Sequence, residues 1–314
     1  MKESAFIKQN SEKWRNFESI DSQNPENLID SFIQLTDDLA YAKTFFPKSQ
    51  TYAYLNSLIS EYYRKIYATK KEKKGRFVTF WSYELPFLFF QYQRQLLYSF
   101  IFFVLAMIVG ALSTANDDTF VRLILGDDYV NTTLENIQKG DPLAIYKSAD
   151  SSSMFFSITI NNIRVAFMAF VLGITFSFGT FWILFSNGIM LGAFQYFFFQ
   201  KGFLLQSFLT IWIHGTLEIS AIVIAGCAGF VMGNSLLFPG TYARSISFRK
   251  GAADGLKITV GLVPIFIMAG FLESFVTRLK LHPAVSLLII FSSLSLILWY
   301  FILLPNKLNK NNHE

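Results

Sequence analysis

Three side chains in this sequence could do chemistry in an apolar environment: His214, Glu218 and Glu273. His214 and Glu218 are four residues apart, so on a helix they share one face. An ionisable residue in a membrane costs about 2.5–3.5 kcal/mol on insertion scales, and it therefore usually faces the interior of a helix bundle. A His–Glu pair there could relay protons, bind a cation or join two helices by a hydrogen bond. The sequence leaves these roles open, and it does not show whether Glu273 meets the same site.

Motifs for catalysis are missing around these residues. His214, Glu218 and Glu273 could supply the three protein ligands of a catalytic zinc ion. However, the sequence has no His-Glu-x-x-His pattern and no second histidine in an apolar stretch. It also lacks a phosphate-binding loop, a Gly-x-Ser-x-Gly elbow and a dinucleotide fingerprint. Because Cys227 is the single cysteine, an intramolecular disulfide and a thiolate zinc cage are excluded. We therefore expect no catalytic residue, no metal and no cofactor, and a protein that is not an enzyme.

The elements that must position these residues are membrane-spanning helices. Of the 314 residues, 52% are hydrophobic and only 16% are charged, whereas soluble domains carry about 25% charged residues. A helix needs about 20 mostly apolar residues to cross a bilayer. Four stretches meet this requirement: 96–115, 208–233, 256–276 and 284–304. Pro264 predicts a kink in the third of them.

The stretch from Val165 to Gln200 is harder to divide. Its 36 residues include no Asp, Glu, Lys, Arg or His, which is too long for one crossing and slightly short for two with a turn. Two breaks are available, one at residues 177–180 and one at 186–188. The stretch is therefore either two short crossings or one crossing with a re-entrant segment.

The distribution of charge predicts the orientation. The residues before the first span include a basic cluster: Arg64, Lys65, Lys70, Lys71, Lys73, Lys74 and Arg76. Such clusters mark the cytoplasmic side. The segment 116–153 has seven acidic and three basic residues and suits the outside, whereas the 234–255 loop and the C-terminus are basic again. We therefore favour six crossings with both ends in the cytoplasm, and five crossings with a re-entrant hairpin is the alternative. No cleavable signal peptide is visible, and we expect a multi-pass protein of the bacterial cytoplasmic (inner) membrane.

The fold class that follows is all-α: a polytopic membrane protein of five to six transmembrane helices with an N-terminal helical domain. We expect residues 1–94 to form this cytoplasmic domain, with amphipathic helices on either side of Pro47 and an interfacial aromatic helix at 77–94. Residues 95–314 then form the bundle, including the extracytoplasmic segment 116–153. We expect membrane lipids to contact the basic cluster and no nucleic acid to bind, because acidic residues are mixed through the domain.

Small residues predict close helix packing. Ala221, Ala225, Gly229 and Gly233 recur every four residues, and Gly188 and Gly192 make a similar step. Such stripes let helices approach closely in lipid. The partner helix could belong to this chain or to a second copy, so a homo-oligomer remains open.

Several segments together resemble one family. The most specific is His214-Gly215-Thr216-Leu217-Glu218 inside a span, and the others, in order, are Phe6–Asn10 with Trp14, Leu35–Ala42, Asn187–Gly192, Gly240–Tyr242 and Gly270–Glu273. Over about residues 1–280 the chain resembles the stage II sporulation protein M family of bacterial integral membrane proteins, in the form found in non-sporulating bacteria. In endospore formers the namesake is a membrane scaffold that joins two peptidoglycan-degrading proteins. The long cytoplasmic domain departs from a minimal scaffold.

Two functions follow as hypotheses. The first is a non-enzymatic scaffold that organises envelope or cell-wall-remodelling proteins, based on the resemblance, the acidic outer segment and the missing catalytic motifs. The second is a transporter or channel that uses the intramembrane His214/Glu218 site with Glu273. Interrupted helices and polar groups at the membrane midplane are typical of transport sites. The two halves of the sequence show no inverted repeat, which favours the scaffold.

Overall fold

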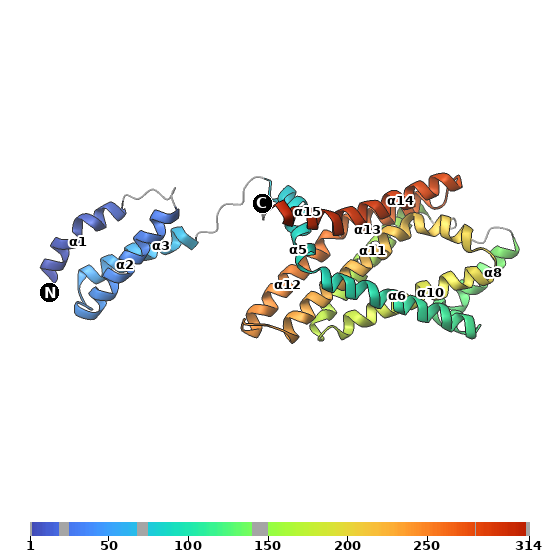
Figure 1. The fold of residues 1–314 in the computed structure, drawn as a ribbon, viewed down its shortest axis with the longest axis horizontal. Helices are drawn as coiled ribbons and strands as arrows, with labels where there is room; N and C mark the ends of the chain where they lie inside the picture. Colours follow the sequence, from blue (N-terminus) through green and yellow to red (C-terminus); the bar gives the residue numbers. More distant parts are fainter. Residues whose placement is uncertain (1, 19–24, 68–74, 140–149, 280, 312–314) are drawn as a thin grey trace. The chain divides into compact units, whose positions relative to one another are not determined.

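The computed structural model describes residues 2–18, 25–67, 75–139, 150–279 and 281–311. All secondary structure in these ranges is helical, which confirms the predicted all-α class (Figure 1). Contacts divide the chain into two units, one ending at Arg76 and one beginning at Phe77. Four lysines of the predicted basic cluster, Lys70, Lys71, Lys73 and Lys74, lie outside the described residues.

The N-terminal unit packs three helices: α1 (Glu3–Glu18), α2 (Pro25–Phe45) and α3 (Gln50–Tyr67). The amphipathic stripes on either side of Pro47 form α2 and α3. The core side chains, all buried, are Phe6, Trp14, Phe17, Leu28, Leu35, Ala42, Leu55, Leu58 and Tyr62. Trp14 Nε1 donates to Asp38 at 2.8 Å, and Tyr62 donates to the Phe17 carbonyl at 2.7 Å. Burial and a hydrogen bond to Glu18 raise the pKa of Tyr54 to about 12.

The aromatic segment after Arg76 packs on the bundle. It forms α4 (Arg76–Thr79), η1 (Phe80–Glu84) and α5 (Leu85–Gln91). Leu85, Leu88 and Phe89 are buried in the bundle core, where the Phe89 ring meets Phe301 edge to face. Glu84 also pairs with Lys257 at 3.3 Å. Residues 77–94 therefore belong structurally with the membrane helices.

Six helices within the described residues are long and apolar enough to cross a membrane. Their elements are α6 (Gln93–Asn116), α9 (Ser151–Val171) with η3 (Leu172–Ile174), α10 (Phe178–Gln200), α11 (Leu204–Leu237), α12 (Arg244–Gly261) with α13 (Val263–Phe271) and η4 (Leu272–Val276), and α14 (Pro283–Leu298) with η5 (Trp299–Leu303) and α15 (Leu304–Asn311). This number agrees with the favoured six crossings. An even number of crossings places the two ends of the bundle on the same side of the membrane.

The stretch 165–200 contains one full helix and part of another. The chain turns at Phe176 and Ser177, whose φ angles are 55° and 71°, next to the first predicted break. The second predicted break, at 186–188, is wrong, because these residues lie inside α10. The stretch belongs to two crossings, as the first alternative had it, but neither is short: α9 begins at Ser151 and carries Arg164 on its exposed side, and α10 covers Phe178–Gln200. The 234–255 loop is shorter than expected, because α12 begins at Arg244.

The break predicted at Pro264 is present. The third hydropathy-predicted span consists of α12 and α13, which meet at Leu262, and Pro264 occupies the first turn of α13. Proline is tolerated in a first turn because the amide that it lacks would have no partner within the helix. The chain then continues through the π-helical turn η4, which carries Glu273.

The segment between α6 and α9 folds as a small cap. It forms α7 (Phe120–Leu125) and α8 (Asp127–Gln138), separated by Gly126 at a φ of 87° that favours glycine. Arg122 donates to Asp127 at 2.9 Å and to Asn131 at 2.8 Å, which joins the two short helices. Val121 and Val130 pack on Phe197, Phe198 and Ile211 of the bundle.

Helix α11 lies inside the bundle, between α12 on one side and α6 and α10 on the other (Figure 1). All residues from Ala221 to Gly233 are buried. Its neighbours approach to backbone contact: a Cβ at Gly229 would collide with the Ala169 carbonyl of α9, and a Cβ at Gly255 of α12 would lie 2.9 Å from the Ala228 carbonyl. Ser99 of α6 donates to the Val223 carbonyl at 2.5 Å.

The α6–α10 contact has the same character. A Cβ at Gly188 would lie 2.8 Å from the Phe103 carbonyl, and one at Gly192 would collide with the Met107 carbonyl. Backbone cannot rotate away as a side chain can, so an added methyl group must separate the helices. The predicted packing glycines thus lie at contacts within this chain.

We expect Gly192→Ala to destabilise the bundle by about 1–3 kcal/mol, the usual cost of overpacking. Gly215→Ala is the matched control, because its Cβ would meet nothing closer than Ile211 at 3.8 Å, and alanine gains about 0.8–1 kcal/mol of helix propensity over glycine. Thermal unfolding of the purified protein in detergent measures both. Equal unfolding temperatures for the two variants would contradict the close packing of α6 and α10.

Candidate functional site

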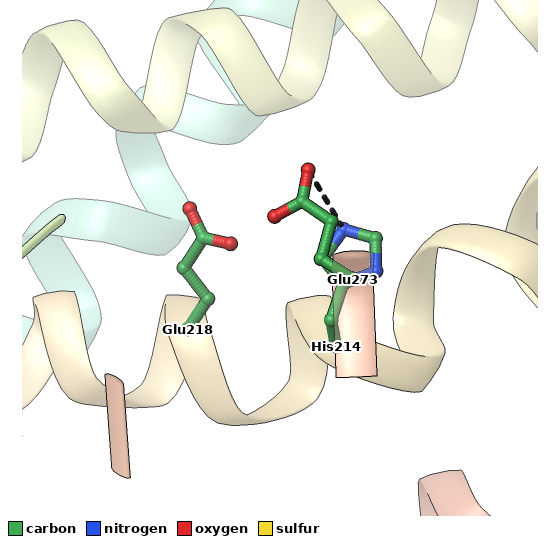
Figure 2. Close-up of side chains that lie close together, drawn as sticks. All are labelled: His214, Glu218 and Glu273. Carbon is green, nitrogen blue, oxygen red and sulfur yellow. Dashed lines mark ion pairs between the residues drawn. The ribbon is translucent and has the colours of Figure 1, made fainter. Parts of the chain in front are cut away.

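The three side chains singled out from the sequence meet at one place. His214 and Glu218 extend from one face of α11, and Glu273 comes from η4 (Figure 2). One ligand atom from each residue lies within 4.8 Å of the others. His214 Nε2 is 3.9 Å from Glu273 Oε1. The structure therefore answers the question that the sequence left open: Glu273 belongs to the same cluster.

A π-helical turn places Glu273. In η4 the Thr277 amide donates to the Leu272 carbonyl, five residues earlier, at 2.8 Å. The wider turn inserts one residue into the helical repeat, and such turns occur frequently at functional sites. The turn also brings Thr277 to the ring of His214, at 3.0 Å from Nδ1.

This contact with Thr277 orients the imidazole. The Thr277 hydroxyl lies 3.1 Å from the Leu272 carbonyl, to which it donates. A hydroxyl has one proton, so when that proton points to the Leu272 carbonyl, Thr277 Oγ1 accepts from His214 and Nδ1 carries the ring proton. In this arrangement Nε2 is an acceptor on the side of Glu273, whereas in the other tautomer the Thr277 hydroxyl donates to Nδ1.

The cluster is buried but borders a cavity of about 330 Å³. His214 is only 4% exposed. The cavity walls come from the cap, α10, α11 and η4. Besides the cluster, the lining residues are mainly apolar or aromatic: Ile124, Leu125, Tyr129, Met190, Leu191, Phe194, Ile211, Trp212, Gly215 and Ile219. His214 follows the first residue of α11 by ten positions, or about 15 Å at 1.5 Å per residue. The cavity therefore extends from the cap side of the bundle to the polar cluster.

Sequence reasoning missed two polar neighbours of the cluster. Asn162 of α9 is 6% exposed, and its amide approaches Glu218 without reaching good hydrogen-bond geometry. Thr277 was missed although it follows Glu273 by four residues, a spacing that places two helical residues on one face. For Asn162 the available signal was two adjacent asparagines in an otherwise apolar stretch.

The fold and these buried polar groups define a multi-pass helical membrane protein with a polar site inside its helix bundle. A family model for stage II sporulation protein M matches residues 99–278, which include α9 to η4 and all three cluster residues. The chain belongs to this family, as the resemblance indicated.

The N-terminal unit has a separate match. A family model for a domain of unknown function covers residues 4–68, so the segments at Phe6–Asn10 and Leu35–Ala42 lie outside the stage II sporulation protein M match. No curated protein and no solved structure matches the chain. The comparisons therefore establish the family of the bundle and leave its biochemical role to be proposed.

We expect Thr277→Val to destabilise the protein by about 1–3 kcal/mol, because the buried His214 ring would lose its hydrogen bond to Thr277 Oγ1. Thr216→Val is the control: Thr216 is also buried, but its hydroxyl donates to the Trp212 carbonyl within α11, and a carbonyl in a helix keeps its backbone donor. The difference between the two unfolding temperatures isolates the contact with His214. A Thr277→Val protein no less stable than Thr216→Val would contradict the assigned hydrogen bond.

Proposed function

We propose that this protein is a non-enzymatic membrane scaffold that assembles envelope or cell-wall-remodelling factors. The observation that carries this proposal is the backbone-to-backbone packing of α6, α9, α10, α11 and α12. Helices in such contact slide or tilt only by breaking many contacts at once. A bundle held in this way suits a fixed platform better than a transporter that must alternate between two conformations.

The platform carries folded units for binding on its surface. The cap α7–α8 is built from its own polar contacts and displays Leu123, which is 78% exposed, next to exposed acidic residues such as Asp128. The basic residues before α6 support a cytoplasmic N-terminus, which would place the cap outside the cytoplasmic membrane. There it would face the cell wall, and the N-terminal unit would face the cytoplasm.

If the protein is a scaffold that binds partners through its cap, Leu123 should contact a specific protein. With a photo-crosslinking amino acid at this position, we expect discrete adducts with cell-wall-remodelling proteins in living cells, identified by mass spectrometry. The same amino acid at Leu288, which is 69% exposed on α14, is the control for contacts made within the lipid.

A second pair of variants tests whether the cap itself binds. Leu123→Ser should lower co-purification of the crosslinked partner, whereas Leu205→Ser should not; Leu205 is similarly exposed at the start of α11. The same set of crosslinked proteins at positions 123 and 288 would count against this surface. Unchanged recovery of the partner with Leu123→Ser would count against it as well.

Transport is the second candidate, and one observation favours it: the ionisable cluster borders a cavity that extends from the cap side. If ions or protons cross through this site, Glu218→Gln should abolish flux in proteoliposomes while the protein remains folded. Glu135→Gln, on the exposed surface of α8, is the control. Flux that persists in Glu218→Gln, or wild-type protein without flux, would remove this candidate.

A further inference from the structure

We propose that His214, Glu218 and Glu273 bind a divalent transition-metal ion of the zinc type. The ligand set is one imidazole nitrogen and two carboxylate oxygens, all donors that zinc uses in proteins. Their ligand atoms already lie within 4.8 Å of one another. This inference goes beyond the proposed scaffold, which depends on helix packing and the cap.

The orientation of His214 favours a cation. In the tautomer in which Nδ1 donates to Thr277, Nε2 presents its lone pair to the cluster. This atom faces the Glu273 carboxylate at 3.9 Å. Two acceptors that face each other require a proton or a cation between them. Metal-bound histidines commonly donate their other ring N–H to a neighbouring group, as His214 does here.

The charge balance points the same way. Within the ranges described, neither Glu218 nor Glu273 forms an ion pair with a lysine or arginine. Two neighbouring carboxylates in an apolar environment are costly unless they are neutralised. Arg278, the nearest cationic residue in the sequence, reaches Ser151 and Met154 instead. A bound divalent cation would neutralise both carboxylates.

Asn162 is an independent indication of a ligand. Its side chain is more than nine-tenths buried and approaches Glu218, yet the amide nitrogen has no hydrogen-bond partner. Buried donors without a partner are uncommon in folded proteins; eight other buried side-chain atoms in the described residues share this feature, but Asn162 is the one that approaches Glu218. A glutamate side chain that turns toward a metal ion would move relative to this amide and can bring a carboxylate oxygen into hydrogen-bond range of it.

The geometry needs only a small adjustment. In a tetrahedral site with bonds of about 2.0–2.2 Å, ligand atoms are about 3.3–3.6 Å apart. The present separations of up to 4.8 Å would shorten to this range if the flexible glutamate side chains changed rotamer. The fourth position would face the cavity of about 330 Å³, where water or a ligand with a polar head and an apolar body could bind.

Metal content tests this proposal directly. The full-length protein, purified in mild detergent, is stripped with a chelator, incubated with Zn²⁺ and desalted. We expect about one zinc ion per chain to remain, as for a site with three protein ligands and one open position. Zn²⁺ should also raise the unfolding temperature, because it binds only the folded state. Ca²⁺ should do neither, since it requires six to eight oxygen ligands.

Isosteric variants assign the ligands. Glu218→Gln and Glu273→Gln should each lower zinc retention by about tenfold or more, whereas Glu135→Gln on the surface of α8 should retain it. X-ray absorption of the wild-type zinc form should show nitrogen and oxygen ligands with one imidazole. Wild-type protein that retains no zinc, or glutamine variants that retain as much as wild type, would overturn the site. Neither result depends on partner capture through the cap.

Discussion

Close approach of helix backbones around α11 is the constraint on which the rest of this bundle depends. In lipid, helices gain nothing from hiding apolar surface, so packing and hydrogen bonds must hold them together. Glycines at 229 and 255 let α9 and α12 approach α11, and Ser99 adds a hydrogen bond to its backbone. Helix α11 is consequently surrounded by protein along most of its length. That surrounding shields the ionisable side chains of α11 from lipid.

The polar cluster follows from this arrangement. His214 and Glu218 lie on one face of α11, and the π-helical turn η4 sets Glu273 and Thr277 against the same face. The contact joins two helices whose polar residues are more than 50 positions apart in the sequence. The hydrogen bond to Thr277 also fixes the orientation of the His214 ring. A hydrogen bond between His214 and Glu218 alone would not need Thr277.

Much of this fold follows from hydropathy and from the spacing of apolar residues. The stripes on α2 and α3, the four clear spans and the break at Pro264 are local patterns, so the sequence predicts them. The start of α9 is hard to predict from hydropathy, because a charged residue, Arg164, lies inside the span on the exposed side of the helix. The placement of 77–94 and the meeting of Glu273 with His214 depend on tertiary contacts, which no local pattern reports. Helix α1 was missed because its buried side chains, Phe6, Trp14 and Phe17, are few among many polar residues.

A bundle that is fixed, with α11 sealed inside it, must keep Cys227 inaccessible, so this residue tests the rigidity of the bundle without any mutation. This single cysteine lies in the middle of α11, fully buried. A buried thiol reacts only when the structure opens to expose it. In native membranes we predict no alkylation of Cys227 by a membrane-permeant maleimide, and complete alkylation after denaturation in detergent. Alkylation in the folded protein would show that α11 becomes accessible, and it would contradict a fixed scaffold.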